Sequence, residues 1–179
     1  MKPFDATSER IGIRRPTMDD CDEFIASAQA SRALHEPWVD PPNTRERFAG
    51  YVQSRQGPGD DGFLVCELKT GRIAGVINLN CIVRGYFQSA YLGYYAFADF
   101  ARRGYMCEGL QLVTRFAFGH LGLHRLESNI QPANLASIAL VKKCGFQKEG
   151  FSPKYLKVFG EWRDHERWAL LGPDEIKPV

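Results

Sequence analysis

The sequence has few of the features that mark secreted, metal-binding or membrane proteins. Its five cysteines are odd in number, widely scattered and contain no C-x-x-C pair, so they predict neither a disulfide framework nor a zinc site. No stretch approaches the roughly 18 apolar residues of a membrane-spanning helix, and the N-terminus lacks the apolar core of a signal peptide. We therefore expect a cytoplasmic protein without a metal and without membrane contact.

An excess of charge of one sign is also missing. The 23 Lys and Arg residues nearly balance the 21 Asp and Glu residues, which does not fit a protein that binds nucleic-acid phosphates along a continuous surface. The composition is otherwise that of a globular protein, with 44% hydrophobic and 12% aromatic residues, and it excludes disorder over most of the length. A length of 179 residues predicts one domain, spanning residues 1–179.

Periodicity, capping residues and turn residues predict a mixture of strands and helices. Strands are expected over 10–14, 63–68, 72–79, 87–97 and 125–131, with two more after residue 146 joined at Phe159-Gly160-Glu161. Helices are expected over 18–30, from the caps Asn43 and Thr44 to about residue 56, after the loop at 102–107 to Gly119 or Gly122, and from Asn134 to about 144. This order predicts an α/β fold with a mainly antiparallel sheet and one or two parallel crossovers.

The loop at residues 102–107, Arg-Arg-Gly-Tyr-Met-Cys, leads from a predicted strand into a predicted helix. Such a loop offers free backbone N–H groups, the positive end of a helix dipole and two guanidinium groups, which together suit a pyrophosphate. It is not a Walker loop, because no G-K-[ST] follows, and it lacks two glycines of the dinucleotide fingerprint. The alternative interpretation is an ordinary solvated helix start.

The series strand, RRGYMCEG, helix, strand, N-x-x-S, helix and KKCGF resembles the GNAT acetyltransferase superfamily. More narrowly, the segments VRGYFQSAYLGYYAF, NLASIALVKKCGFQKEG and GEWRDHERWAL resemble the RimJ/RimL branch, which acetylates protein N-termini, including those of ribosomal proteins. The resemblance covers nearly the whole chain. It implies a single-domain GNAT-like fold, whose twisted, mostly antiparallel sheet is flanked by helices and splayed between its fourth and fifth strands, and acetyl-CoA as the cosubstrate.

The resemblance also implies where acetyl-CoA binds. The pyrophosphate would lie on the backbone of residues 102–107, and the pantetheine arm would run beside the end of the 91–97 strand and reach Asn134. The implied cofactor-binding residues are Tyr95, Ala96, Phe97, Arg102, Arg103, Gly104, Tyr105, Met106, Cys107, Asn134 and Ser137. Ala101 and Met106 depart from the family's loop pattern, so Met106 must turn its side chain away from the phosphates.

The catalytic residues are implied with alternatives. Val141 stands where much of the superfamily has a tyrosine acid, so the serine of N-x-x-S, Ser137, becomes the candidate that protonates the departing thiolate; its alternative role is in the helix cap. Tyr91 stands where many relatives have a glutamate base, which leaves Glu127 on the neighbouring strand as the nearest candidate base. The alternative for Glu127 is a solvated strand residue.

The predicted reaction is direct transfer of acetyl from acetyl-CoA to a primary amine in a ternary complex. The expected acceptor is the α-amine of a protein, with a ribosomal protein as the first candidate. The implied acceptor-binding residues are Trp38 and Tyr91, and Trp38→Ala is expected to raise the acceptor KM without changing acetyl-CoA affinity. Two alternatives stay open: a small amine such as a polyamine, amino sugar or amino acid, which an acidic pocket would favour, and a non-catalytic module that binds acetyl-CoA or a ribosomal surface. The sequence leaves open whether the protein is a monomer or a homodimer.

Overall fold

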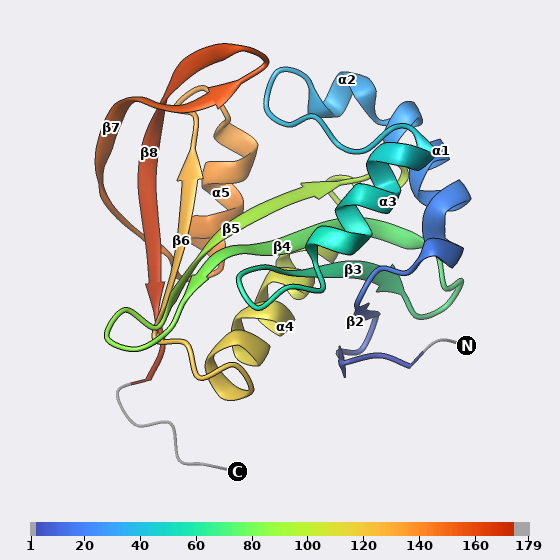
Figure 1. Ribbon diagram of the computed structural model, residues 1–179, viewed down its shortest axis with the longest axis horizontal. Coiled ribbons are helices and arrows are strands. Elements are labelled where there is room, and N and C mark those ends of the chain that lie inside the picture. Colours follow the sequence, from blue (N-terminus) through green and yellow to red (C-terminus); the bar gives the residue numbers. More distant parts are fainter. Residues whose placement is uncertain (1–2, 174–179) are drawn as a thin grey trace.

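The computed structural model describes residues 3–173 and contains an open eight-stranded sheet with helices on both faces (Figure 1). The strands are β1 (Ala6–Thr7), β2 (Ile11–Arg14), β3 (Asp61–Glu67), β4 (Ile73–Val83), β5 (Ser89–Ala96), β6 (Arg125–Ile130), β7 (Gln147–Val158) and β8 (Glu161–Leu171). The α-helices are α1 (Cys21–Ala30), α2 (Arg32–His35), α3 (Arg45–Ser54), α4 (Tyr105–Gly119) and α5 (Leu135–Lys143). No helix among residues 3–173 is both long and apolar enough to cross a membrane.

The strand order β1-β2-β3-β4-β5-β6-β8-β7 contains one parallel pair among the described strands, β5 with β6. Their pairing runs from Ser89 opposite Arg125 to Leu92 opposite Ser128 and then stops. Because β5 continues to Ala96, the two strands separate beyond this point, as Figure 1 shows. The predicted mixed, splayed α/β fold is confirmed, and the splay leaves a gap in the middle of the sheet.

Alternating residues of the central strands fill two separate cores. On β3, Phe63 and Val65 face the core beneath α4, whereas Leu64 and Cys66 face the core beneath α1 and α3. A strand buried on both faces reads as a continuous apolar run, which is how this segment appears in the sequence. Both faces of the sheet are therefore covered by packed side chains.

Local signals define the elements that border the gap. The Asn134 side chain accepts a hydrogen bond from the Ser137 N–H at 3.1 Å and so caps α5, as Asn does at helix starts. Gly104 precedes α4 with φ of +85°, a left-handed conformation that glycine adopts without penalty. The predicted start of α5 at the Asn134 cap is confirmed, whereas α4 begins at Tyr105, within the segment 102–107 that was predicted as a loop.

The N-terminal region differs from prediction in three details. The helix α2 was not predicted, because its four residues are too few to show a periodic pattern. The helix expected over 18–30 begins with a 3-10 turn, Met18–Asp20, before α1, because the Asp20 carboxylate accepts the Thr17 N–H at 2.8 Å and also pairs with Arg14. The short edge strand β1 was not predicted. Two residues that pair with Gly12 and Ile13 leave no periodic pattern in the sequence.

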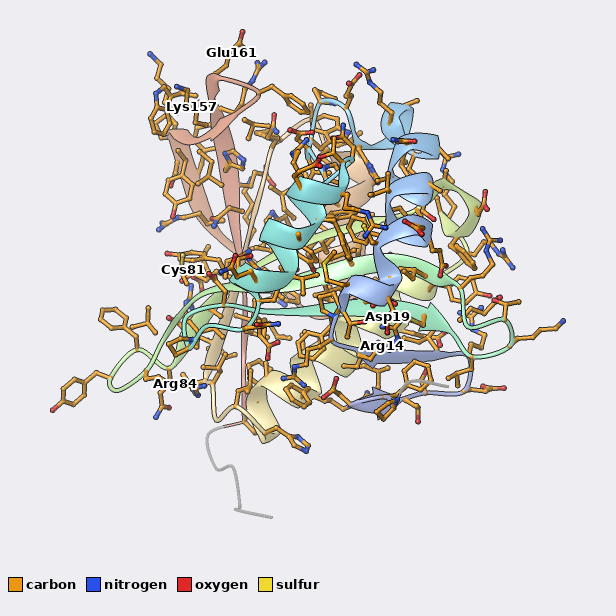
Figure 2. All side chains as sticks on the ribbon, turned by 45° about the vertical axis from the view of Figure 1, so that its right-hand side comes forward. Arg14, Asp19, Cys81, Arg84, Lys157 and Glu161 are labelled. Carbon is orange, nitrogen blue, oxygen red and sulfur yellow. The ribbon has the colours of Figure 1, made fainter. Side chains whose placement is uncertain are left out.

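The β7–β8 hairpin extends the sheet beyond the core. Figure 2 shows Lys157 and Glu161 at its tip, away from the body of the molecule. In Figure 1 this tip faces the loop that follows α2 across the open end of the sheet. The hairpin and this loop thus border the gap between β5 and β6 from opposite sides.

Candidate active site

The end of β5 presents backbone groups to the gap that the splay opens. The Phe97 N–H donates to the Ala74 carbonyl of β4 at 2.9 Å. Because alternate residues of a strand direct their N–H and C=O groups to opposite sides, Tyr95 and Phe97 face β4, whereas Tyr94 and Ala96 face the gap. An extended ligand can hydrogen-bond to these outward groups as an added strand would.

A buried histidine anchors this strand end. His35 is 3% exposed, and its Nε2 donates to the Ala96 carbonyl at 2.8 Å. Burial lowers the pKa of His35, so the ring is neutral and its Nδ1, which is buried and has no partner, is unprotonated. Tyr95 and Phe97 pack their side chains near this ring, with centroids 5.2 and 6.1 Å away. They support the strand end from within the core.

A cavity of about 430 Å³ lies between the end of β5, the loop before α4 and helix α5; we call it the α5 cavity. It brings together most of the predicted cofactor residues. Those that line it are Tyr95, Ala96, Arg102, Gly104, Met106, Cys107, Asn134 and Ser137. Arg102 and Lys143 are its cationic lining residues, and none of the lining residues is a carboxylate. The α5 cavity therefore suits a long ligand with an anionic end.

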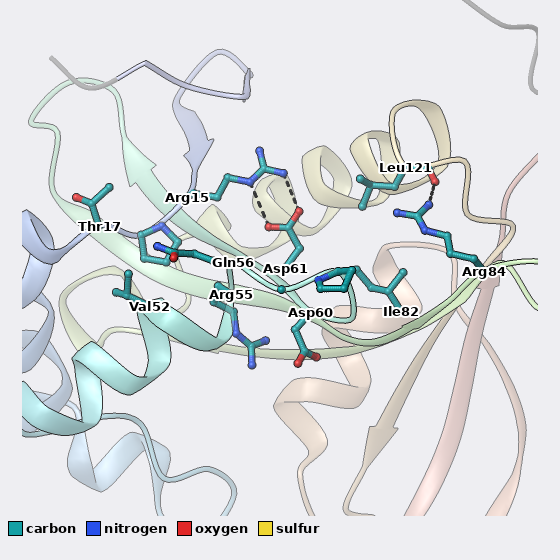
Figure 3. Close-up of a pocket in the computed structure, with 13 residues that line it drawn as sticks. Arg15, Thr17, Val52, Arg55, Gln56, Asp60, Asp61, Ile82, Arg84 and Leu121 are labelled. Carbon is teal, nitrogen blue, oxygen red and sulfur yellow. Dashed lines mark hydrogen bonds and ion pairs between the residues drawn. The ribbon is translucent and has the colours of Figure 1, made fainter.

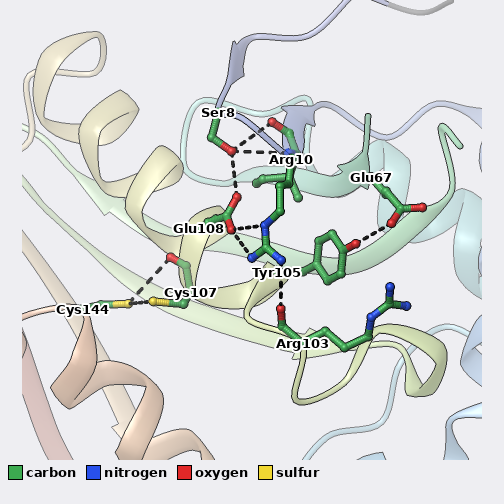
Figure 4. A network of polar contacts seen from close by, with 9 residues as sticks. Ser8, Arg10, Glu67, Arg103, Tyr105, Cys107, Glu108 and Cys144 are labelled. Atoms are coloured by element: carbon green, nitrogen blue, oxygen red, sulfur yellow. Dashed lines mark hydrogen bonds and ion pairs between the residues drawn. The ribbon is translucent and has the colours of Figure 1, made fainter. Parts of the chain in front are cut away.

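The loop before α4 and the first turn of this helix have features that favour the binding of an anion. In the first turn of α4 the backbone amides have no preceding helical carbonyls, and the helix dipole adds positive potential. The carboxylate of Glu108 would oppose an anion there, but Arg10 forms an ion pair with it, and the Ser8 hydroxyl donates to it at 3.0 Å (Figure 4). The pairing offsets the one acidic side chain of this turn.

Three predicted cofactor residues, Phe97, Arg103 and Tyr105, do not line the α5 cavity. Tyr105 is 5% exposed and its hydroxyl donates to Glu67, while the Arg103 guanidinium lies 5.2 Å from the centre of the Tyr105 ring. Figure 4 shows this group beside the loop. Tyr105 thus holds the loop against the body of the protein, while the exposed Arg103 side chain lies beside it.

Met106 lies with its side chain toward the sheet. A Cβ atom added to Gly75 of β4 would come within 2.4 Å of the Met106 sulfur, so the methionine occupies the space that a side chain at residue 75 would need. Met106 packs against the α4 core. The Met106 side chain thus packs toward the sheet while it still lines the α5 cavity, and Gly75 is the residue that permits this position.

Cys107, in the first turn of α4, has a sulfur neighbour. The Sγ atoms of Cys107 and Cys144 lie 3.6 Å apart (Figure 4), and burial raises the pKa of Cys144 to about 12. A thiol with a raised pKa is a poor nucleophile at neutral pH. Cys144 therefore packs against the start of α4 as a thiol.

A second cavity, of about 150 Å³, lies in the gap itself between β5, β6 and β8; we call it the β6 cavity. The two cavities share five lining residues: Trp38, Val39, Tyr94, Asn134 and Ser137. At this junction the Tyr94 hydroxyl and the Ser137 hydroxyl are 2.6 Å apart, and burial raises the pKa of Tyr94. A hydroxyl pair therefore lies where the two cavities meet.

Sequence reasoning identified Ser137 but missed Tyr94. The two residues are 43 positions apart, and no local pattern predicts that a strand tyrosine reaches the first turn of a later helix. Trp38, predicted for the acceptor side, lines both cavities. The expectation that Trp38→Ala affects the acceptor alone therefore loses its structural basis.

Two predicted residues lie away from the cavities. The Glu127 carboxylate pairs with Arg125 at 2.7 Å and lines neither cavity. Tyr91 is opposite Glu127 in the register and also lines neither; its hydrogen bond with Tyr155 raises the pKa of Tyr91 to about 12. The geometry therefore places neither residue at the junction.

A larger cavity of about 590 Å³ lies elsewhere, where the end of α3 meets the start of β3 (Figure 3). Its charged groups are already engaged, since Arg15 pairs with Asp61 at 2.7 Å and Arg84 donates to the Leu121 carbonyl. None of the predicted site residues lines it.

Among residues 3–173 no cluster of His, Cys, Asp and Glu side chains could hold a metal ion.

Comparison with known proteins identifies the family. Residues 10–147 match the family described as Acetyltransferase (GNAT) domain. The chain is 30% identical over 177 residues to the probable N-acetyltransferase YjcK of Bacillus subtilis, covering 98% of this chain and 94% of that protein. It is 39% identical over 102 residues to the [ribosomal protein uS5]-alanine N-acetyltransferase of Escherichia coli, covering 57% of this chain and 53% of that protein.

Solved structures agree in fold. The ribosomal-protein-S5-alanine acetyltransferase of Vibrio fischeri superposes with a TM-score of 0.84 at 23% identity, covering 97% of this chain and 98% of that one. Several similarly folded acetyltransferases are complexes with CoA or acetyl-CoA. The predicted family and cosubstrate are thereby confirmed, and the α5 cavity has the lining that this cosubstrate requires. The chain belongs to the GNAT family and is an acetyl-CoA-dependent N-acetyltransferase.

Proposed function

We propose that the acceptor is the α-amino group of a protein N-terminus, with a ribosomal protein as the first candidate. The observation that carries this proposal is the lining of the β6 cavity, which contains uncharged polar and apolar groups and one histidine but no carboxylate. A polyamine carries several positive charges and would leave them unpaired in such a cavity. A single amino group that enters uncharged does not meet this cost.

The size and surroundings of the β6 cavity support the same acceptor. About 150 Å³ accommodates an amino group with a small side chain, and the loop after α2 and the β7–β8 hairpin stand on either side of the gap (Figure 1). The rest of a peptide would leave between them. The uS5-alanine enzyme of Escherichia coli, a relative of this chain, is named for an acceptor residue with a small side chain.

The groups at the junction of the two cavities can carry out the acetyl transfer. The acceptor nitrogen attacks the thioester carbonyl carbon, a C–N bond forms and the C–S bond breaks. Ser137 gives its hydroxyl proton to the departing sulfur and recovers one from Tyr94, whose oxygen is 2.6 Å away. A phenol has an ordinary pKa near 10, far below that of an alcohol, so Tyr94 is the better proton source of the two. The backbone amides of Tyr94 and Ala96 that face the gap are the candidate donors to the developing oxyanion.

The acceptor class is tested by mass measurement. The protein is incubated with acetyl-CoA and paired peptides that begin with alanine, one with a free and one with a blocked N-terminus, each containing a lysine, and separately with spermidine. We expect one added acetyl group on the free N-terminus only. Acetylation of spermidine without acetylation of the peptides would assign a small-amine acceptor. No reaction at all, with acetyl-CoA still bound, would support the non-catalytic alternative.

A further inference from the structure

The β6 cavity contains two hydrogen-bond acceptors without partners. The Oδ1 atom of Asn129 is buried and unpaired. His165 is 3% exposed, and its Nδ1 lies 2.9 Å from the Arg163 carbonyl. Because a carbonyl oxygen only accepts, Nδ1 carries the hydrogen, and Nε2 of the neutral ring has a free lone pair. Among residues 3–173 no group is hydrogen-bonded to Nε2.

Both acceptors lie on the side of the sheet opposite to α5. Trp168 of β8 faces α5, where the Lys142 ammonium lies 5.4 Å from its ring. Successive strand residues alternate between faces, so His165 lies on the other face, and so does Asn129, which is one residue beyond the cross-strand partner of Trp168. Ser137, which also lines the β6 cavity, projects from α5. The cavity thus has an acid on one side and proton acceptors on the other.

The surroundings of His165 keep its ring neutral. Burial lowers the pKa of His165, against the opposing effects of the Arg163 carbonyl and of Asp164. The Asp164 carboxylate accepts the Lys154 N–H at 2.8 Å, and β7 places the ring of Tyr155 with its centre 6.2 Å from that of His165. The groups that β6, α5 and the loop after α2 contribute to the cavity are uncharged.

Resting on the proposed transfer to an α-amino group, we propose that Nε2 of His165 accepts the proton that the acceptor nitrogen loses, and that Asn129 Oδ1 orients that nitrogen. As the C–N bond forms, one proton passes from nitrogen to Nε2; as the C–S bond breaks, one proton passes from Ser137 to sulfur. His165 then releases its proton to water, and Ser137 is reprotonated by Tyr94, which regains its own proton from water, so protons balance over the cycle. His165 is thus a catalytic residue, and Asn129 is a positioning residue.

The test measures kcat against pH at saturating acetyl-CoA and a free alanine N-terminal peptide. In the unaltered protein kcat should fall on the acid side as His165 gains a proton. The His165→Gln variant should lose about 100-fold in kcat, as expected for removal of a general base, and should lose this acid limb. Its dissociation constant for acetyl-CoA should not change, which also shows that the variant is folded.

The matched control is His120→Gln. The His120 ring stacks on Phe116 with centroids 4.8 Å apart, just beyond the far end of α4, and this variant should keep both kcat and its pH profile. If His165→Gln acetylates the peptide at the normal rate, or if kcat of the unaltered protein has no acid limb, the role of His165 is overturned. If the unaltered protein does not acetylate the peptide, the proposed acceptor is wrong instead.

Discussion

The α5 cavity and the β6 cavity each contain one buried histidine, and the two rings are held in opposite ways. His35 uses its distal nitrogen, Nε2, to anchor the Ala96 carbonyl, and its other nitrogen is buried. His165 uses its proximal nitrogen, Nδ1, on the nearby Arg163 carbonyl, which leaves the distal one for the cavity. Burial lowers the pKa of both. The direction of the pKa shift thus does not distinguish the two histidines, whereas the nitrogen that each ring uses for its backbone hydrogen bond does.

The linings of the two cavities differ in charge as well. Arg102 and Lys143 line the α5 cavity near a helix start, so it favours an anion. The β6 cavity has no charged lining residue, so it favours an amine that has lost its proton. The Ser137–Tyr94 pair lies in the wall common to both cavities. Two reactants of different charge can therefore meet at this pair, while the remaining lining residues of each cavity contact one reactant alone.

The largest expected effect on kcat comes from substitutions of the two hydroxyl residues at the junction of the cavities. Ser137→Ala should lower kcat about 100-fold, because it removes the group that protonates the thiolate. Tyr94→Phe should lower kcat less, about tenfold, since the Ser137 hydroxyl remains. If the tyrosine acts through the serine, the double variant should be no slower than Ser137→Ala alone.

Single-turnover rates with all three variants measure this relation, with Ser137→Thr as the variant that keeps a hydroxyl and should keep most of the activity. Losses that multiply in the double variant would show that the two hydroxyls act independently. A larger loss in Tyr94→Phe than in Ser137→Ala would make the tyrosine the direct proton donor.

The features that the sequence predicted well are those with local causes. Gly104, the two arginines before it and the apolar spacing of α4 all lie within one short segment, so the loop and its helix could be predicted together. The same holds for α5, because its N-cap residue, Asn134, accepts a hydrogen bond from the N–H of Ser137, three residues later. Each of these signals depends on neighbours in the chain, and the fold does not alter them.

The features that were missed depend on the register of distant strands. That Tyr94 reaches Ser137 follows from the splay, and the face on which His165 lies is fixed by the pairing of Ser128 with Trp168. The position of Glu127 could have been judged better, because residues two apart on a strand share a face, and Arg125 pairs with it. The missed catalytic candidates required tertiary structure.

A second prediction tests whether each cavity binds one substrate, by placing a leucine in each cavity in turn. Ala139→Leu enlarges a residue of α5 that lines the α5 cavity, and it should weaken acetyl-CoA binding about tenfold, or ~1.4 kcal/mol, with the acceptor KM unchanged. Asn129→Leu removes the unpaired oxygen of the β6 cavity and keeps the branching of the side chain. It should raise the acceptor KM about tenfold through one lost hydrogen bond, with acetyl-CoA affinity unchanged.

Calorimetric titration with acetyl-CoA and initial rates over a range of peptide concentrations separate these two effects. A variant that changes both constants would show that its cavity serves both substrates. Exchange of the two effects would reverse the assignment of the cavities.

The smallest effect concerns the stability contributed by His35. Its pKa is lowered in the folded protein, so below the ordinary value near 6.5 the unfolded chain takes up a proton that the folded chain resists. The contribution of His35 to the free energy of unfolding should therefore be complete above about pH 6.5. It should be lost as the pH falls from there through the pKa of His35 in the folded protein. The slope from this residue is at most ~1.4 kcal/mol per pH unit. Urea unfolding at a series of pH values measures the slope.

The His35→Gln variant separates the two histidines. Its amide can still donate to the Ala96 carbonyl, but it does not titrate, so the fall in stability on the acid side should become shallower. The acid limb of kcat should persist in this variant, because that limb belongs to His165. If His35→Gln removed the acid limb of kcat instead, the titrating group behind catalysis would be in the α5 cavity, and the distinction drawn from the anchored nitrogens would fail.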